Sequence, residues 1–325
     1  MTIITDRRTA LLGATTAAMA PLIGDAHAVG TPAVGAGGGE LLFISGASLE
    51  ATEFAEWESE GRGGELYGSR LMIATGKEQL AKAPKTAARY TQKRYNFPSG
   101  SFRVLHYKKG GPVVHQIVME TEILILQGSV ELSPLYGVKG PTAKLSAGDA
   151  LFLPGGVLKN PNPTEDTILL LAQVEFAKVG AKGSIVYGKD LKEAETVQWV
   201  QDGKEMTARN ADEAKAAPAN AARYYVKRYV GDGNSIRYVT MKKGKTNNAV
   251  TTGRDVIIYI PKGRLTRVEG DHTFEMVAGD AVREKLGNPG HWVVHEDGTV
   301  FIATDAPMLP VNFAPTMAAA GGMMK

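Results

Sequence analysis

The sequence contains no cysteine and no marked excess of charge of either sign. Without cysteine the chain can form no disulfide and can carry out no thiol chemistry, so its folded core must supply the stability. The 37 Lys and Arg residues nearly balance the 34 Asp and Glu residues, for a net charge of +3. This balance excludes the basic footprint of a nucleic-acid-binding protein and the polybasic patch of a membrane-surface protein.

The sequence also lacks an apolar run long enough to span a membrane. Its first apolar stretch, Ala10–Ile23, is short and is interrupted by Gly, Thr and Pro. Two adjacent arginines, Arg7 and Arg8, precede it, and small residues follow it at positions 26–28 (Ala-His-Ala). This order is typical of a secretory signal peptide, and the paired arginines indicate the twin-arginine route. We expect residues 1–28 to be removed and the mature chain to be periplasmic or secreted.

An internal repeat is the strongest signal in the rest of the chain. Residues 93–110 align without a gap on residues 227–244, and eight of the 18 positions are identical. Farther along, the tetrapeptide Ala-Gly-Asp-Ala at 147–150 recurs at 278–281. An ordered series of matches at nearly constant spacing indicates duplication. We therefore predict two diverged copies of one domain.

Each copy has the composition of a β-protein. Short segments of β-branched, aliphatic or aromatic residues alternate with Gly, Pro, Asn and Asp, which is typical of a sandwich or barrel. The clearest predicted strands are Phe102–Tyr107, Ile123–Leu126, Ser129–Leu132, Ala150–Leu153 and Thr167–Val174. Helices should be few and short: one near Gly76–Lys82, and one or two turns within residues 190–195 and 211–222.

These patterns divide the mature chain into five parts. Residues 29–92 are expected to form an N-terminal tail with leading strands, and residues 93–176 the first β-unit. Residues 177–222 are a connector with the leading strands of the second copy, and residues 223–310 form the second β-unit. The Ala-, Gly- and Met-rich residues 311–325 are predicted to be a flexible tail.

Two motifs of the first copy resemble those of the cupin superfamily. Residues 110–115 (Gly-Gly-Pro-Val-Val-His), followed by Glu122 and Gly128, resemble the first cupin motif. Residues 148–156 (Gly-Asp-Ala-Leu-Phe-Leu-Pro-Gly-Gly) resemble the opening of the second. The resemblance implies an all-β fold of two double-stranded β-helix barrels in tandem, a bicupin.

The second copy departs further from the cupin pattern. Gly279 and Gly287 keep the spacing of the second motif, but Lys285 stands in place of its proline. The second barrel is therefore predicted to be structural.

The resemblance also implies a metal site, which this sequence keeps only in part. Cupins hold a divalent metal with two histidines and a glutamate from the first motif and a histidine from the second. His115 matches the first histidine, whereas Ile117 and Lys159 replace the other two. The glutamate position falls between Glu120 and Glu122. The implied site is degenerate, with His115 and Glu122 as the candidate ligands of one Fe, Mn, Ni or Zn ion.

The remaining candidates are assigned by residue type and position. The candidate catalytic residues are His115, Lys159, Glu122 and His106, and the candidate ligand-binding residues are Arg103, Tyr107, Glu120, His291 and Trp292. Lys159 would pair with Glu120 or Glu122 in an anion-binding floor or act as a base, unless its loop shifts and it reaches water. Arg103 recurs as Arg237, which favours a scaffold role or an anion site.

These observations give one leading hypothesis and two alternatives. The leading one is an exported bicupin that binds or acts on a small polar molecule, such as a sugar acid or another carboxylate, in its first barrel. The alternatives are an atypical metal-dependent oxygenase, lyase or isomerase, and a non-catalytic structural or binding bicupin. Cupins often pair their sheets, which implies a homodimer. The sequence leaves open whether the protein is an enzyme.

Overall fold

The structure of the chain is a computed structural model of residues 1–325. It describes residues 33–34, 42–60, 69–97, 100–110, 115–116, 121–134, 143–153, 158–173, 182–232, 234–247, 249–250, 256–269, 272–284 and 289–304. The predicted signal peptide, the predicted tail at 311–325, Ile117 and Glu120 lie outside these residues.

The described chain is mostly β-structure, which confirms the predicted fold class. The strands of the first half are β1 (Ala33–Val34), β2 (Leu42–Ile44), β3 (Thr52–Glu60), β4 (Ser69–Thr75), β5 (Ala88–Phe97), β6 (Gly100–Tyr107), β7 (His115–Gln116), β8 (Thr121–Gln127), β9 (Ser129–Pro134), β10 (Ala143–Ser146), β11 (Ala150–Leu153), β12 (Leu158–Pro163) and β13 (Thr167–Gln173). Those of the second half are β14 (Ser184–Val186), β15 (Ala194–Gln201), β16 (Lys204–Thr207), β17 (Ala222–Val230), β18 (Ser235–Met241), β19 (Gly244–Lys245), β20 (Ala249–Val250), β21 (Val256–Lys262), β22 (Arg264–Glu269), β23 (His272–Val277), β24 (Ala281–Glu284), β25 (Pro289–Val294) and β26 (Thr299–Thr304).

The short helices agree with the sequence only in part. Helix α2 (Lys77–Lys82) confirms the predicted helix, and α3 (Ala211–Ala216) lies within the predicted 211–222. The described residues also form the 3₁₀ turns η2 (Gly46–Ser48) and η3 (Gly188–Asp190). The prediction of a helical turn at 190–195 is wrong beyond Asp190, because β15 begins at Ala194 and pairs with β17. No helix of the described chain is long and apolar enough to cross a membrane.

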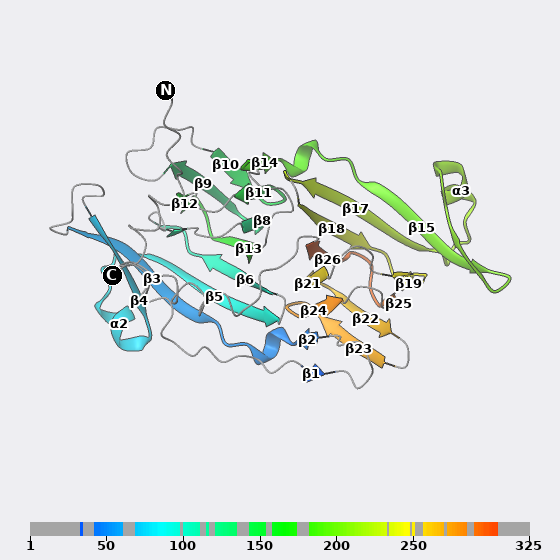
Figure 1. Cartoon of the computed structure of the whole chain (residues 1–325), viewed down its shortest axis with the longest axis horizontal. Coiled ribbons are helices and arrows are strands. Elements are labelled where there is room, and N and C mark those ends of the chain that lie inside the picture. Colours follow the sequence, from blue (N-terminus) through cyan, green and yellow to red (C-terminus); the bar gives the residue numbers. More distant parts are fainter. Residues whose placement is uncertain are drawn as a thin grey trace, which may run out of the picture.

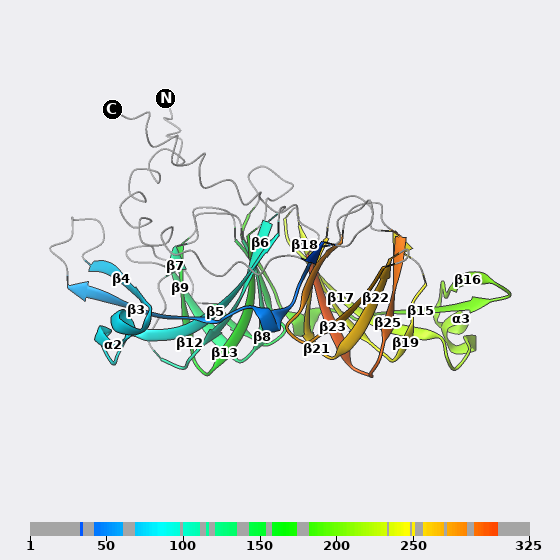
Figure 2. The ribbon, with the colours of Figure 1, turned by 90° about the horizontal axis from the view of Figure 1, so that it is seen from below.

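Two pairs of facing sheets form two barrels. In barrel 1, the sheet β14-β11-β8-β13-β6-β5-β3-β4 faces the sheet β10-β9-β12-β7. In barrel 2, the sheet β1-β2-β24-β21-β26-β18-β17-β15-β16 faces the sheet β19-β25-β22-β23, and β20 pairs with β25. The two barrels lie side by side, with α2 and α3 at opposite ends of the molecule (Figures 1 and 2).

Strand alternation decides which side chains enter barrel 1. On β8, Ile123 and Ile125 point into the barrel and pack with Val130 and Leu145 of the facing sheet. Leu124, between them, points the other way and is also fully buried, because the outer face of this sheet lies against barrel 2. A strand buried on both faces has a continuous apolar sequence instead of an alternating one.

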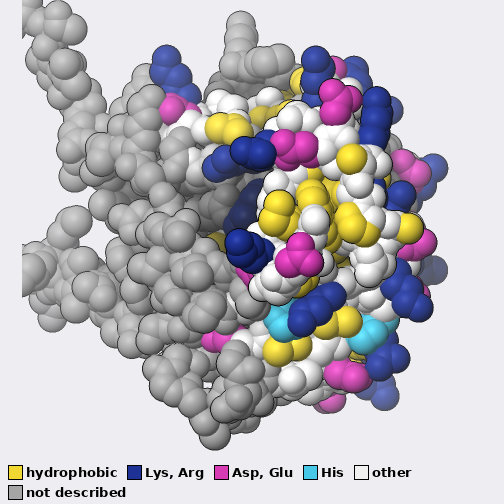
Figure 3. Space-filling view, turned by 90° about the vertical axis from the view of Figure 1, so that its right-hand side faces the viewer, with side chains coloured by type: hydrophobic (Ala, Val, Ile, Leu, Met, Phe, Trp, Pro, Cys, Tyr) yellow, Lys and Arg dark blue, Asp and Glu magenta, His cyan; other side chains and the backbone are white. Residues whose placement is uncertain are grey.

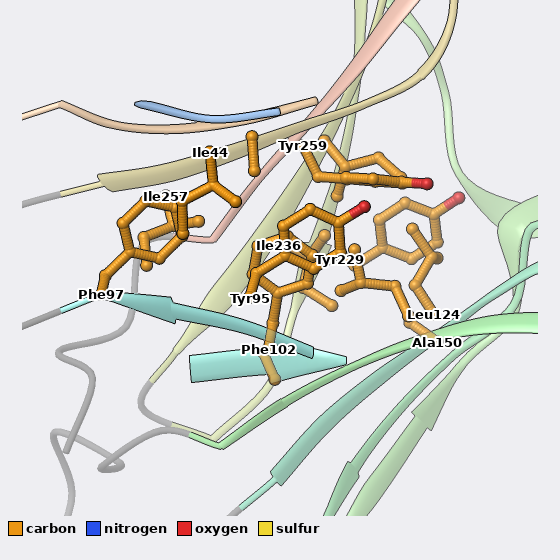
Figure 4. Close-up of a cluster of buried hydrophobic side chains, with 14 of the residues drawn as sticks. Ile44, Tyr95, Phe97, Phe102, Leu124, Ala150, Tyr229, Ile236, Ile257 and Tyr259 are labelled. Carbon is orange, nitrogen blue, oxygen red and sulfur yellow. The ribbon is translucent and has the colours of Figure 1, made fainter. Parts of the chain in front are cut away.

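The side chains buried between the barrels form what we call the between-barrel layer. It contains Ile44, Leu49, Tyr95, Phe97, Phe102, Leu124, Ala150, Phe152, Leu170, Ala172, Tyr229, Ile236, Ile257, Tyr259, Ala281 and Ile302. At its centre the rings of Tyr95 and Phe102 stack with centroids 4.4 Å apart, and Tyr259 of barrel 2 meets both edge-on (Figure 4). Large apolar side chains from both halves thus share one core.

The two copies also exchange their leading strands. Strand β2, from the N-terminal half, pairs with β24 of barrel 2, and β14, from the second half, pairs with β11 of barrel 1. Each exchanged segment docks on a repeated Ala-Gly-Asp-Ala turn: the Gly46 N–H donates to Asp280 Oδ1 and the Gly188 N–H to Asp149 Oδ1, each at 2.9 Å. Exchange therefore ties each barrel to the other by backbone pairing.

The surface at the end of the molecule carrying barrel 2 has mixed chemistry. On the face shown in Figure 3, basic and acidic side chains are interspersed around a group of apolar ones. Two apolar residues of the hairpin β15–β16, Val200 and Met206, are exposed.

Candidate functional site

Glu122 does not point into barrel 1. It shares the outer face of β8 with Leu124, and its Oε1 accepts a hydrogen bond of 2.6 Å from Nδ2 of Asn234, which precedes β18 of barrel 2. The side chain is fully buried at this boundary. Glu122 is therefore placed to link the two halves, and it is not positioned as a ligand inside barrel 1.

His106 also lies on an outer face. It alternates with Leu105 and Tyr107 on β6, both of which point into the barrel, and it is partly exposed. It interacts electrostatically with Asp166, which accepts hydrogen bonds from Lys108 Nζ and the Lys109 N–H, each at 2.9 Å. The sequence-based option that His106 faces the barrel interior is thus wrong.

His115 and Lys159 are brought together by the backbone. They are directly opposed in the register of β7 and β12, and Lys159 is in turn opposed to Pro134 of β9. In the facing sheet, Thr121 pairs with Leu153 at the same end of the barrel, where β8 begins and β11 ends. This end of barrel 1, which we call the motif end, therefore carries both positions singled out by the cupin motifs.

Arg103 and Tyr107 lie on the inner face of β6, on either side of buried Leu105. Arg103 is directly opposed to Arg94 of β5, three residues from the hairpin between these strands. Tyr107 is opposed to Tyr90, and their ring centroids are 5.2 Å apart. Arg94 and Tyr90 thus join the two predicted ligand-binding residues inside the barrel.

A buried carboxylate completes the polar groups of the inner face. Glu56 of β3 is 2% exposed, and its Oε1 accepts a 2.5 Å hydrogen bond from the Tyr90 hydroxyl. Burial first, and then the charge of Glu56, raise the pKa of Tyr90 and of Tyr107 well above the ordinary value. Both hydroxyls are therefore neutral at physiological pH and act as hydrogen-bond groups.

The arginine pair, Arg94 and Arg103, brings together two positive charges on side chains that are each partly buried. Burial, followed by the charge of Arg94, lowers the pKa of Arg103 to about 10, so Arg103 is still charged at neutral pH. Burial also lowers the pKa of Arg94. The Nε atom of Arg94 is buried and has no hydrogen-bond partner in the described part of the chain. These are the conditions under which an anion would be attracted.

Sequence analysis missed Arg94, Tyr90 and Glu56. The sequence does carry a signal for Arg94, because Arg94 belongs to the repeated Lys-Arg-Tyr at 93–95 and Arg103 is repeated in the same aligned segment. Glu56 carries no such signal, since it belongs to a leading strand outside the aligned segments.

The interior of barrel 2 is filled differently. Arg267 of β22 is 2% exposed, and its Nη2 lies 3.1 Å from Glu284 Oε1 and 3.8 Å from Glu269 Oε2. Its guanidinium carbon lies 5.0 Å from the ring centroid of Trp292, which is directly opposed to it on β25. Gly290 leaves room for it, since a Cβ there would be 2.6 Å from the guanidinium. The ion pair of Arg267 and Glu284 thus occupies the interior of barrel 2 at the end where β21 begins and β24 ends.

The two predicted ligand-binding residues of barrel 2, His291 and Trp292, lie on opposite faces of β25. Trp292 points inward and packs on Arg267 and on Phe301. His291 alternates with it and lies on the outer face, where burial and then the charges of Lys245 and Arg267 lower its pKa. The structure does not bring His291 and Trp292 together in one site.

The candidate metal ligands do not fit a metal inside barrel 1. Glu122 belongs to the between-barrel boundary, whereas His115 belongs to the facing sheet of barrel 1. Within the described ranges, no group of three or more His, Asp or Glu side chains could hold a metal ion. The described part of barrel 1 instead gathers arginines, tyrosines and one acid on its inner face.

Comparison with solved structures identifies the fold. Protein Ylba from E. coli matches with a TM-score of 0.51 at 12% identity, over 88% of this chain and 95% of that chain. A glyoxylate-induced protein from Pseudomonas aeruginosa matches with a TM-score of 0.51 at 11% identity, over 87% and 96%. AerE from Microcystis aeruginosa matches with a TM-score of 0.50 at 11% identity, over 66% and 90%.

These likenesses show the fold alone. The chain has the two-barrel cupin fold that its motifs predicted. No protein-family model matches the sequence, and no curated protein matches it. The candidate site of this chain is the polar inner face of barrel 1.

Proposed function

We propose that this protein is an exported bicupin that binds a small organic anion, a carboxylate, inside barrel 1. The observation that carries the proposal is the arginine pair, in which Arg94 and Arg103 are directly opposed on the inner face of β5 and β6. Export rests on residues 1–28, and an N-terminus at Val29 in the protein recovered outside the cytoplasm would support it.

The chemistry of the pair favours a carboxylate. A guanidinium presents its N–H groups in a planar fork that matches the two oxygens of a carboxylate. Two such groups side by side attract an anion more strongly than either alone, and a bound anion offsets the repulsion between the two guanidinium groups. Partial burial of both side chains strengthens the attraction, because less water screens it.

The position of the pair supports a site at the motif end. Arg103 is opposed to Leu171 of β13, which is opposed to Ile123 of β8, two residues from Thr121 at the start of that strand. The arginine pair therefore lies near the end of barrel 1 where His115 and Lys159 are paired.

The direct test compares equivalent arginines in the two barrels. Arg237 is opposed to Arg228 as Arg103 is opposed to Arg94, so R237Q is a matched control for R103Q. Thermal stabilisation and calorimetric binding would be measured with a panel of small carboxylates. We expect R103Q to weaken binding at least about tenfold, since a hydrogen bond to a charged group is worth about 1.5–3 kcal/mol.

Two outcomes would contradict the proposal. One is that no carboxylate in the panel binds the wild-type protein. The other is that R237Q weakens binding as much as R103Q does. The unliganded unfolding temperature of each variant separates loss of binding from loss of folding.

A further inference from the structure

The inner face of barrel 1 is electrostatically asymmetric. The arginine pair lies toward the motif end, whereas Glu56 and the hydroxyls of Tyr90 and Tyr107 lie farther along the barrel. On β6, Arg103 and Tyr107 are four residues apart, about 13 Å between Cα atoms at the usual strand rise. The face therefore offers cationic donors at one end and an acceptor at the other.

The two tyrosines lie between these charges. Glu56 and Arg103 act on both hydroxyls with opposite sign: Glu56 favours their neutral form and Arg103 favours their ionised form. Tyr90 donates to Glu56, so its hydroxyl fixes the orientation of the carboxylate. Phe54 stacks on Tyr90 with ring centroids 5.0 Å apart and holds that tyrosine in place.

Barrel 2 provides an internal comparison. Its register places Gln198 where barrel 1 has Glu56, because each is opposed to the alanine that begins the next strand, Ala222 or Ala88. In the same way Met241 stands in place of Tyr107. The arginine pair is present in both barrels, but the carboxylate and the second tyrosine occur only in barrel 1.

We propose that Glu56, oriented by Tyr90, is a specificity-determining residue that accepts a hydrogen bond from the far end of the ligand. The preferred ligand then has a carboxylate at one end, for the arginine pair, and a hydroxyl or ammonium group at the other. A dicarboxylate of equal length is disfavoured, because its second charge would lie against Glu56. This inference rests on the proposed function and narrows its ligand class to hydroxy- and amino-carboxylates.

The test uses matched small acids as probes. Binding of γ-hydroxybutyrate, γ-aminobutyrate, succinate and butyrate, with longer homologues of each, would be measured by calorimetry on wild type, E56Q, E53Q and R103Q. E56Q introduces the side chain found at the equivalent position of barrel 2. Glu53 is an exposed acid on the same strand, paired with Arg89 at 3.4 Å, so E53Q controls for charge alone.

We expect wild type and E53Q to bind the hydroxy- or amino-acid about tenfold more tightly than the dicarboxylate of equal length, and E56Q to lose this preference. If E56Q and wild type discriminate equally while R103Q abolishes binding, the inference is wrong and the proposed function stands. If none of the acids binds wild type, both are wrong. Unfolding of unliganded E56Q shows whether the variant is folded.

Discussion

At the scale of single residues, the two copies show how one position can change role. Register makes Arg267 of β22 equivalent to Leu132 of β9, and Glu284 of β24 equivalent to Leu153 of β11. Barrel 1 fills these positions with leucines, whereas barrel 2 fills them with an ion pair. A buried pair repays the cost of desolvation only while both partners are present.

Replacing Arg267 alone should be severely destabilising. R267L leaves the Glu284 carboxylate buried without its cation, and we expect a loss of about 3–5 kcal/mol in the free energy of unfolding. The double variant R267L/E284L restores the leucines of barrel 1 and removes the Glu284 charge, so it should recover part of that loss; Glu269, 3.8 Å from Arg267, still loses this cation. Urea unfolding monitored by circular dichroism measures both.

The control for this pair lies on the same strand. Arg264 bonds Glu275 at 2.9 Å on the surface, and R264L should cost less than about 1 kcal/mol because water screens exposed pairs. A double variant no more stable than R267L would contradict the account, since it would mean that the shape of the arginine side chain matters more than its charge.

Residue orientation could be predicted only where one face of a strand is wet. The run Ile123–Leu126 gives no alternation because both of its faces are buried, so the sequence could not tell whether its neighbour Glu122 faced the barrel or its exterior. The first cupin motif suggested the interior, and the contact with Asn234 shows the exterior. The resemblance to the motif thus identified the strand that carries Glu122, but only the structure shows on which face of that strand its side chain lies.

At the scale of elements, the exchanged strands depend on two close backbone contacts. A Cβ on Gly46 would lie 2.0 Å from the carbonyl oxygen of Gly279, and one on Gly188 would lie 2.0 Å from that of Gly148. The same carbonyls accept hydrogen bonds from Tyr95 (2.6 Å) and Tyr229 (2.8 Å) across the boundary. Each repeated turn therefore meets a glycine and a tyrosine from the other half.

Substitution of either glycine should weaken the docking of its strand. In G46A or G188A the methyl group must displace backbone, and we expect each variant to lose about 3 kcal/mol or more in unfolding free energy. G110A is the control, because the nearest atom to its Cβ would be 3.8 Å away, and it should be nearly neutral. Equal stability of all three variants in urea would show that the exchanged segments are loosely held.

The strands themselves were predictable, but their partners were not. The expected strands at 102–107, 123–126, 129–132, 150–153 and 167–174 are found as β6, β8, β9, β11 and β13. Tight turns such as Gly128, with φ of +78°, connect neighbours along the chain. Strands β2 and β14 have three residues each and pair with distant partners, and such short segments carry too little pattern to specify a partner.

At the scale of the whole molecule, the two copies resemble a dimer within one chain. The resemblance to cupins implied that sheets of two subunits pack together. Here the outer faces of two sheets of a single chain pack together across the between-barrel layer (Figure 4). Burial raises the pKa of Tyr229 and of Tyr259 in this layer to about 12, which keeps both hydroxyls neutral. The apolar outer face of each barrel is thus covered by the other barrel.

This architecture predicts that both barrels unfold in one transition. Separating them would expose the rings of Tyr95, Phe102 and Tyr259 and break the pairing of β2 and β14. Exposing a large apolar side chain costs about 1.5–3 kcal/mol, so a state with one barrel folded is far less stable than the native state.

Tryptophan variants can follow each half separately. Trp57 packs beside Ala55 and Leu80 at the barrel 1 end, whereas Trp199 and Trp292 lie in the second half. W199F/W292F therefore reports on barrel 1 and W57F on barrel 2. We expect each variant to show one urea midpoint by fluorescence that coincides with its own midpoint by circular dichroism, and a calorimetric enthalpy equal to the van't Hoff enthalpy. Separate fluorescence and circular dichroism midpoints within either variant would mean that the between-barrel layer opens before the barrels do, and that the copies are independent domains in contact.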